Sequence, residues 1–142
     1  MASAFQKCNS FVQDLAQKVH NLNADAAFVA LTNTAPTAST TTYTGLPGEV
    51  AAGGGYSTGG MAVAGTISAT QTSGTLHYKT TANTVFTATT GFGPFRYVLL
   101  YNNTPAGKQA IGYYDYGSAV TLAALETFTI DMTTNTDILT IV

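Results

Sequence analysis

Few residues of this 142-residue chain have side chains that could carry out acid–base, nucleophilic or metal chemistry. The imidazoles are His20 and His77, and the one thiol is Cys8. A catalytic or metal-binding histidine needs two or three convergent partners, and the sequence offers no such set for either one. No G-x-S-x-G motif presents a serine nucleophile. The sequence therefore predicts a protein that is not an enzyme and that has no metal or other cofactor.

Glycines are concentrated in residues 45–60, where a phosphate-binding loop would be one interpretation. Such a loop needs a lysine and a hydroxyl residue directly after its glycines, so that both can reach phosphate and Mg²⁺. The glycines at 53–60 contain Tyr56 and Ser57 between them and are followed by Met61. Their spacing also differs from G-x-G-x-x-G. We therefore expect bends in the backbone, because glycine adopts unusual backbone angles at low cost.

Two groups of acidic residues could have a chemical role. Residues 131–137 place oxygen-bearing side chains at alternate positions, as in a calcium loop, but the loop's glycine and bidentate glutamate are missing. A strand–turn–strand explains the same residues. Glu126, Asp115 and Asp131 could supply the carboxylate pair of a glycoside hydrolase, which needs a separation of about 5–10 Å. The sequence does not determine that distance, and each acid also fits a solvated strand face.

A group of tyrosines is the best candidate for binding. Tyrosine is enriched in protein interfaces, and its ring also stacks on sugars. The alternative is a core whose phenol groups reach the rim. We expect Tyr97 and Tyr101 in the core and Tyr114 or Tyr116 at the surface. The full group is Tyr97, Tyr101, Tyr113, Tyr114 and Tyr116.

All five tyrosines fall in residues 91–117, and this segment predicts a β-hairpin. Residues 95–101 are rich in β-branched and aromatic side chains, as in a packed strand. Residues 102–107 contain asparagine, proline and glycine, which favour a turn. Residues 111–116 then return as the antiparallel partner. Both faces of the first strand are largely apolar, so we expect it to be central and covered on both sides.

Residues 10–22 predict an amphipathic helix, preceded by an N-terminal arm at residues 1–9. Ser10 and Gln13 have the spacing of a capping box. An apolar stripe runs along one side of the helix; its members are Phe11, Leu15, Val19 and Leu22. The stripe could lie across the chain's own sheet or dock on another subunit.

The rest of the chain predicts short strands separated by turns. Residues 26–34 form the first strand, and residues 37–60 a long loop with short edge strands at 41–44 and 49–52. Further strands are expected at 61–70, 74–81, 83–89, 120–122, 127–132 and 137–142, with a final hairpin turn at 133–136. This pattern indicates one all-β domain over residues 1–142. Residues 26–142 would form an antiparallel β-sandwich or jelly roll next to the helix.

Composition limits the class of partner. Charged residues make up 8% of the chain, against about 25% in a typical protein. The formal net charge is −2, and the five basic residues are scattered, so direct nucleic-acid binding is not expected. The start of the chain has no apolar signal segment, and no apolar run is long enough for a membrane span. We therefore expect a protein that is made in a cytoplasm, contacts no membrane and packs against other proteins.

Several segments together resemble the small virion proteins of tailed bacteriophages, and most closely the jelly-roll capsid decoration, or cement, proteins. The segments that carry the resemblance are residues 10–22, 30–36, 50–60, 71–74, 93–98, 100–103, 111–118 and 126–131. They cover nearly the whole chain, and none is catalytic. Where relatives of this pattern have Trp-Trp-Asp-Tyr, this chain has Tyr-Tyr-Asp-Tyr at 113–116.

The resemblance implies a protein of the virion that binds the outer surface of the capsid and joins neighbouring major capsid subunits. Because strands at sheet edges can pair between chains, we also expect a homo-oligomer, a dimer or a trimer. Two alternatives remain: a structural protein of the phage tail, neck or fibre, and a carbohydrate-binding β-sandwich module. The residues expected to contact a partner are Phe5, Phe11, Val12, Leu46, Tyr56, Tyr114 and Tyr116.

Overall fold

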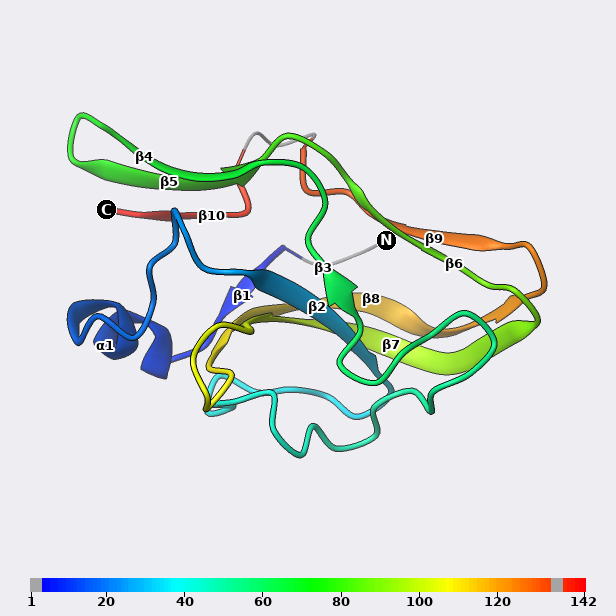
Figure 1. Cartoon of the computed structure of the whole chain (residues 1–142). Helices are drawn as coiled ribbons and strands as arrows, with labels where there is room; N and C mark the ends of the chain where they lie inside the picture. Colours follow the sequence, from blue (N-terminus) through cyan, green and yellow to red (C-terminus); the bar gives the residue numbers. More distant parts are fainter. Residues whose placement is uncertain (1–3, 134–136) are drawn as a thin grey trace.

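A computed structural model describes residues 4–133 and 137–142. The chain is mostly β, its sheets are antiparallel, and it has one short helix (Figure 1). In chain order the elements are β1 (Gln6–Lys7), α1 (Ser10–Ala16), β2 (Ala27–Thr32), β3 (Met61–Ala62), β4 (Ile67–Thr72), β5 (Thr75–Thr80), β6 (Thr84–Thr87), β7 (Gly91–Asn102), β8 (Ala110–Ala123), β9 (Thr127–Ile130) and β10 (Leu139–Ile141).

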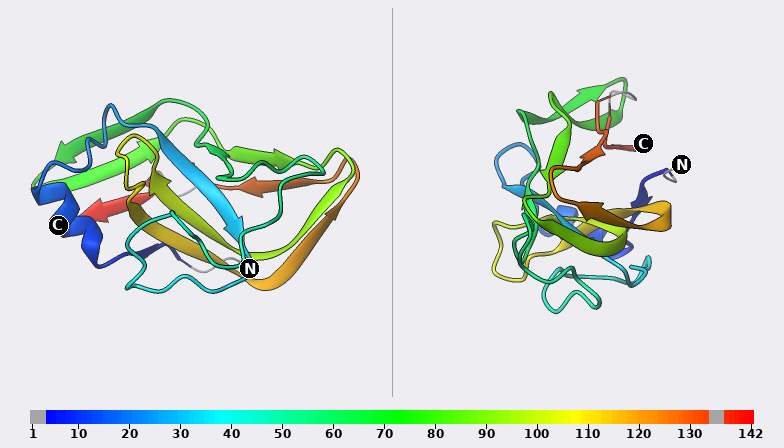
Figure 2. Two further views of the ribbon diagram at one scale, coloured as in Figure 1. Left: turned by 60° about the horizontal axis from the view of Figure 1, so that its bottom comes forward. Right: turned by 90° about the vertical axis from the view of Figure 1, so that its right-hand side faces the viewer.

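The strands form three antiparallel sheets. The largest has the order β1-β8-β7-β2-β3, the second has the order β10-β5-β4, and β6 pairs with β9. The two smaller sheets lie across from the large one (Figures 1 and 2). Apolar side chains from all three sheets fill the space between them, including Val29, Phe95, Tyr78, Phe86 and Ile130. This burial is the main favourable contribution to folding.

The predicted hairpin is confirmed as β7 and β8, and β7 is the central strand of the large sheet. β7 lies between β8 and β2, and its residues 98–101 are buried. Strict alternation along residues 95–101 would place Phe95 on the same face as Leu99 and Tyr101, but Phe95 packs in the main core with Val98 and Leu100, whereas Leu99 and Tyr101 face the other side. The alternation is interrupted where the pairing with β8 shifts, between Phe95 and Tyr97.

A long loop covers the second face of the large sheet. Tyr43 and Leu46, from this loop, are buried against Leu99, Tyr101 and Ala30. The edge strands expected at 41–44 and 49–52 are reduced to isolated bridges, Thr42 to Gln109 and Thr32 to Glu49. Backbone hydrogen bonds near these bridges, such as that from the Val50 N–H to the Leu31 carbonyl at 3.0 Å, hold the loop together with its side-chain contacts.

The helix is shorter than predicted. α1 ends at Ala16, and Lys18 takes the left-handed conformation with φ of 63°. The Val19 N–H then donates to the Asp14 carbonyl at 2.8 Å, which closes the helix in the way a glycine commonly does. The predicted capping box does not form, because Asn9 is the N-cap residue and no side chain makes a capping hydrogen bond.

The described part of the N-terminal arm contains an edge strand: β1 pairs with β8, and Cys8 is fully buried. One further expectation is wrong. The expected final hairpin is absent, because β9 pairs with β6 while β10 pairs with β5. The turn predicted at 133–136 lies mostly outside the described residues.

Candidate partner-binding surface

Aromatic side chains from three segments meet beside β8. The Phe5 ring lies 5.0 Å from the Tyr114 ring, centre to centre. The Tyr116 ring lies 5.4 Å from that of Phe128 and nearly perpendicular to it. Tyr116 is 36% exposed, and the other three side chains are half-buried. We call these four residues the aromatic surface.

Strand pairing brings Phe5 to Tyr114, whereas Phe128 reaches Tyr116 from a different sheet, in which β9 pairs with β6. The register of β1 on β8 places Gln6 opposite Tyr113, so that Phe5 reaches Tyr114. Further along β8, Asp115 pairs with Tyr97, and Val120 with Phe95. Between these two pairs, β8 advances by five residues (115 to 120) and β7 by only two (95 to 97). The extra residues at 116–119 form an exposed bulge, and bulges often re-aim side chains at functional positions.

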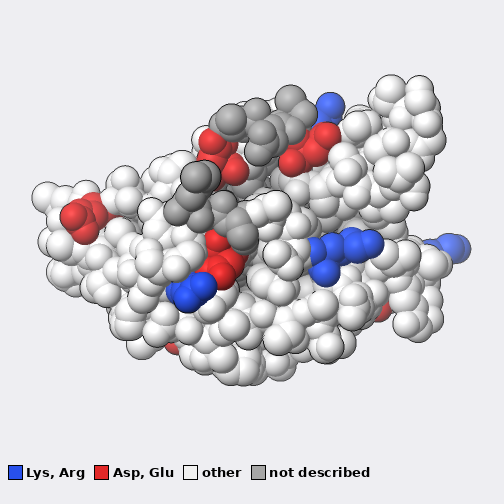
Figure 3. All heavy atoms as spheres, turned by 180° about the vertical axis from the view of Figure 1, so that it is seen from behind, with Lys and Arg blue, Asp and Glu red and all other residues white. Residues whose placement is uncertain are grey.

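An ion pair borders the aromatic surface. Arg96 donates two hydrogen bonds of 2.8 Å to the Asp115 carboxylate, and this contact lowers the pKa of Asp115. Burial, and secondarily the nearby Asp131, raise the pKa of Tyr114 to about 12. The Tyr114 phenol is therefore neutral and able to donate at physiological pH. Elsewhere charge is sparse: Figure 3 shows a face on which charged residues occupy a few separate places.

The residues expected to contact a partner divide into three groups. Phe11, Leu46 and Tyr56 belong to the core, with exposed fractions of 0%, 9% and 3%, so this chain itself covers them. Val12 is 45% exposed on α1. Phe5, Tyr114 and Tyr116 are brought together as described above. Sequence reasoning missed Phe128, although the apolar alternation of residues 127–132 was a signal for it.

A second polar cluster, around Glu49, was not expected. The Glu49 carboxylate accepts hydrogen bonds from the Tyr43 hydroxyl at 2.8 Å, the Tyr56 hydroxyl at 2.9 Å and the Gly59 N–H at 2.6 Å. Burial is the largest cause of the raised pKa values of both tyrosines. The Tyr101 hydroxyl completes the cluster by donating to the Gly59 carbonyl at 2.8 Å. This arrangement fixes the glycine-rich loop and offers no nucleophile.

The two histidines have separate surroundings. His20 is buried, and its Nδ1 lies 3.1 Å from the Asn102 amide nitrogen. It lies four residues beyond the end of α1, not in the last helical turn as expected. His77 lies 2.8 Å from the Asp137 carboxylate. Within residues 4–133 and 137–142, no group of three or more His, Cys, Asp or Glu side chains could hold a metal ion.

The acidic residues considered for chemistry have local structural contacts. Asp115 binds Arg96, and the Glu126 carboxylate accepts a hydrogen bond from the Ala123 N–H at 2.7 Å. Asp131 accepts from the Thr133 N–H at 3.2 Å. Residues 134–136 of the calcium-like pattern lie outside the described residues.

Comparison with known proteins adds no relative. No protein-family model, no curated protein and no solved structure gives a significant match to this chain. Among the described residues, no helix is long and apolar enough to cross a membrane. The function is therefore argued from the chain's own residues.

Proposed function

We propose that this chain is a non-enzymatic structural protein that binds the outside of a tailed-bacteriophage head as a decoration, or cement, protein. Its fold would be a β-sandwich of the jelly-roll type, with the large sheet as one layer and the two smaller sheets as the other. The resemblance of its segments to phage decoration proteins supports this proposal, as does the low content of charged residues.

The aromatic surface is the observation that carries the proposal. Protein interfaces are enriched in tyrosine and phenylalanine and depleted in lysine, glutamate and aspartate. Tyr116 and Phe128 keep part of their rings exposed although apolar burial would be favourable. Arg96 and Asp115 neutralise one another at the border, so a partner can cover this region without burying an unpaired charge.

The proposed mechanism depends on copy number. Each copy would bury a modest area across two neighbouring capsid subunits, and many copies would act on one shell. A protein that binds the assembled lattice but not its free subunits stabilises the lattice by mass action. No covalent step, nucleic acid, membrane or cofactor enters this mechanism.

A substitution on the virion tests the proposal. Phage particles that carry Tyr116→Ser in the gene for this chain should bind fewer copies of the protein than wild-type particles do. The matched control is Val85→Ser, because Val85 is similarly exposed, at 40%, and its neighbour Phe86 points into the core. Copies per particle are measured by gel densitometry of purified heads.

The same measurement separates the alternatives. Hundreds of copies on isolated heads support the capsid role, whereas a few to dozens on isolated tails support a tail, neck or fibre protein. Absence from the particle contradicts both. In that case the carbohydrate-binding alternative is examined with a glycan array at millimolar ligand. Point substitution is preferable to deletion of residues 1–9, because that deletion also removes the buried Cys8 and the edge strand β1.

A further inference from the structure

An exposed leucine stands at one end of the molecule. Leu125 lies in the turn between β8 and β9 and is 83% exposed. Its backbone is fixed, because the Leu125 N–H donates to the Ala88 carbonyl at 2.9 Å and the Ala88 N–H donates to the Glu126 carbonyl at 2.9 Å. The leucine is therefore presented by an ordered turn.

Leu125 is also in an unfavourable backbone conformation. Its φ is 70°, in the left-handed region where a side chain with a Cβ is disfavoured and glycine is the usual residue. The turn thus carries both an exposed apolar side chain and a strained backbone, and Leu125 packs against little in its own chain. Strain of this kind is most often retained at functional positions.

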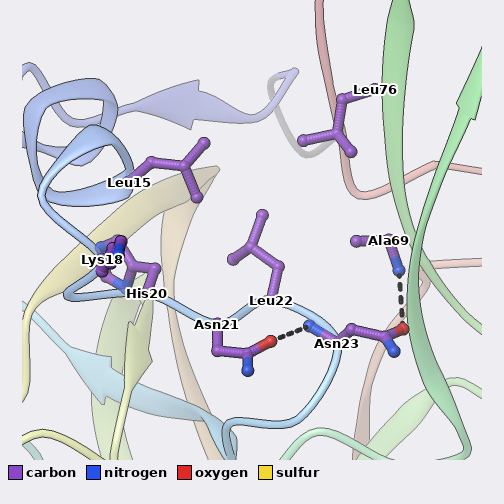
Figure 4. A pocket seen from close by; sticks show the side chains of 8 residues that line it. All are labelled: Leu15, Lys18, His20, Asn21, Leu22, Asn23, Ala69 and Leu76. Atoms are coloured by element: carbon purple, nitrogen blue, oxygen red, sulfur yellow. Dashed lines mark hydrogen bonds between the residues drawn. The ribbon is translucent and has the colours of Figure 1, made fainter.

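A pocket that contains three leucines lies at the opposite end. α1 and the β4–β5 turn mark one end of the molecule and the β8–β9 turn marks the other (Figure 1). The pocket has a volume of about 440 Å³, within the range of ligand-sized pockets. Leu15 from α1 and Leu76 from β5 line facing sides, with Leu22 between them (Figure 4). The rest of the lining is Ala69 and the polar residues Lys18, His20, Asn21 and Asn23.

We propose that the Leu125 turn of one copy inserts into the Leu15, Leu22 and Leu76 pocket of a second copy. The two ends complement each other in shape, since one is an apolar projection and the other a recess with three leucines on its wall. One acid and one base can also meet there, because Glu126 follows Leu125 and Lys18 lines the pocket. Contacts of this head-to-tail type produce a ring if the rotation between copies closes and an open chain if it does not.

Self-association of the purified chain is the direct measurement, by sedimentation equilibrium from about 1 µM to 1 mM. Leu125→Gly should raise the dissociation constant by about 10- to 100-fold, because the contact then loses the free energy of burying one leucine side chain. The same change should leave the melting temperature equal or higher, because glycine relieves the positive φ. Val85→Ser, at another exposed apolar residue, should leave the dissociation constant unchanged.

A mixing experiment distinguishes this contact from one in which two copies of Leu125 meet. Ala69→Phe places a ring in the pocket on a strand that tolerates aromatic residues, and it should weaken association as much as Leu125→Gly does. In a mixture, Ala69→Phe supplies an intact turn and Leu125→Gly supplies an intact pocket. The two variants should therefore form a heterodimer with the affinity of the wild-type contact, and no larger assembly should form. Circular dichroism confirms that each variant is folded.

Three results would overturn the proposal. They are a wild-type chain that stays monomeric up to about 1 mM, an unchanged dissociation constant for folded Leu125→Gly, or a mixture of the two variants that does not associate. Each is measured on purified protein without capsids, so none of them bears on the proposed capsid role.

Discussion

The Tyr56 hydroxyl in the glycine-rich loop accepts a hydrogen bond of 3.0 Å from the backbone N–H of Leu31 in β2. The same hydroxyl donates to Glu49 at 2.9 Å. One phenol oxygen thus joins the central sheet to the loop that covers it, and both partners lie in a largely buried region. The loop is thereby held in place although it has no strand of its own.

Removal of that hydroxyl is the first prediction. Tyr56→Phe leaves the Leu31 N–H without its partner, whereas the Glu49 oxygen that loses Tyr56 still accepts a hydrogen bond from the Gly59 N–H. A buried group without a partner costs about 1–3 kcal/mol, so we expect the free energy of unfolding to fall by about that amount in urea denaturation. Tyr43→Phe, which removes one bond to Glu49 only, should cost less. Tyr116→Phe, on an exposed ring, should change stability by less than about 0.5 kcal/mol; equal losses for all three variants would contradict the role of Tyr56.

The second prediction compares two glycines with the same φ of 72°, Gly45 and Gly60. A Cβ at Gly45 meets no atom, whereas a Cβ at Gly60 overlaps the Val29 carbonyl of β2. Gly45→Ala should therefore cost only the backbone strain, about 1–2 kcal/mol. Gly60→Ala should cost about 4 kcal/mol or more, because the loop must move off the sheet. Similar melting temperatures for the two variants would show that the loop does not pack closely on β2.

The third prediction concerns His20 and acid. Burial lowers the pKa of His20 below 6.5, although Asp14 and Asp25 act in the opposite direction. Below about pH 6.5 the unfolded chain then binds more protons than the folded chain, so the free energy of unfolding falls as the pH falls. Urea denaturation between about pH 8 and pH 5 measures this slope. His20→Gln should reduce the slope and His77→Gln serves as the matched control; an unaltered slope in His20→Gln would disprove the assignment.

The fourth prediction concerns the reactivity of the thiol. Cys8 is fully buried, and burial raises its pKa to about 11. Because the thiolate is the nucleophile, the native protein at pH 8 should react with an aromatic disulfide reagent more than about 100-fold slower than the urea-unfolded chain. The release of the coloured thiolate gives both rates. Comparable rates would mean that β1 separates readily from β8 and exposes Cys8.

Local signals in the sequence were sufficient for the β7–β8 hairpin and for most strands. Residues 95–101 favour a strand through their own side chains, and residues 102–107 favour a turn through theirs. The burial of the tyrosines was predicted in part: Tyr101 is 1% exposed and Tyr116 is 36% exposed, as expected, whereas Tyr97, expected in the core, is only half-buried. Such preferences depend on residues close in the chain.

Tertiary structure decided the rest, because the deciding contacts join residues far apart in sequence. Lys18, just after α1, takes a left-handed conformation in which glycine is the usual residue. Because the sequence has no glycine at this position, it gave no signal for the end of the helix. The bulge in β8 depends on its register with β7, and it determines where Tyr116 meets Phe128. Leu125 and the pocket of Leu15, Leu22 and Leu76 came into view only with the fold, since exposure and cavity shape are properties of the folded surface and not of any single segment.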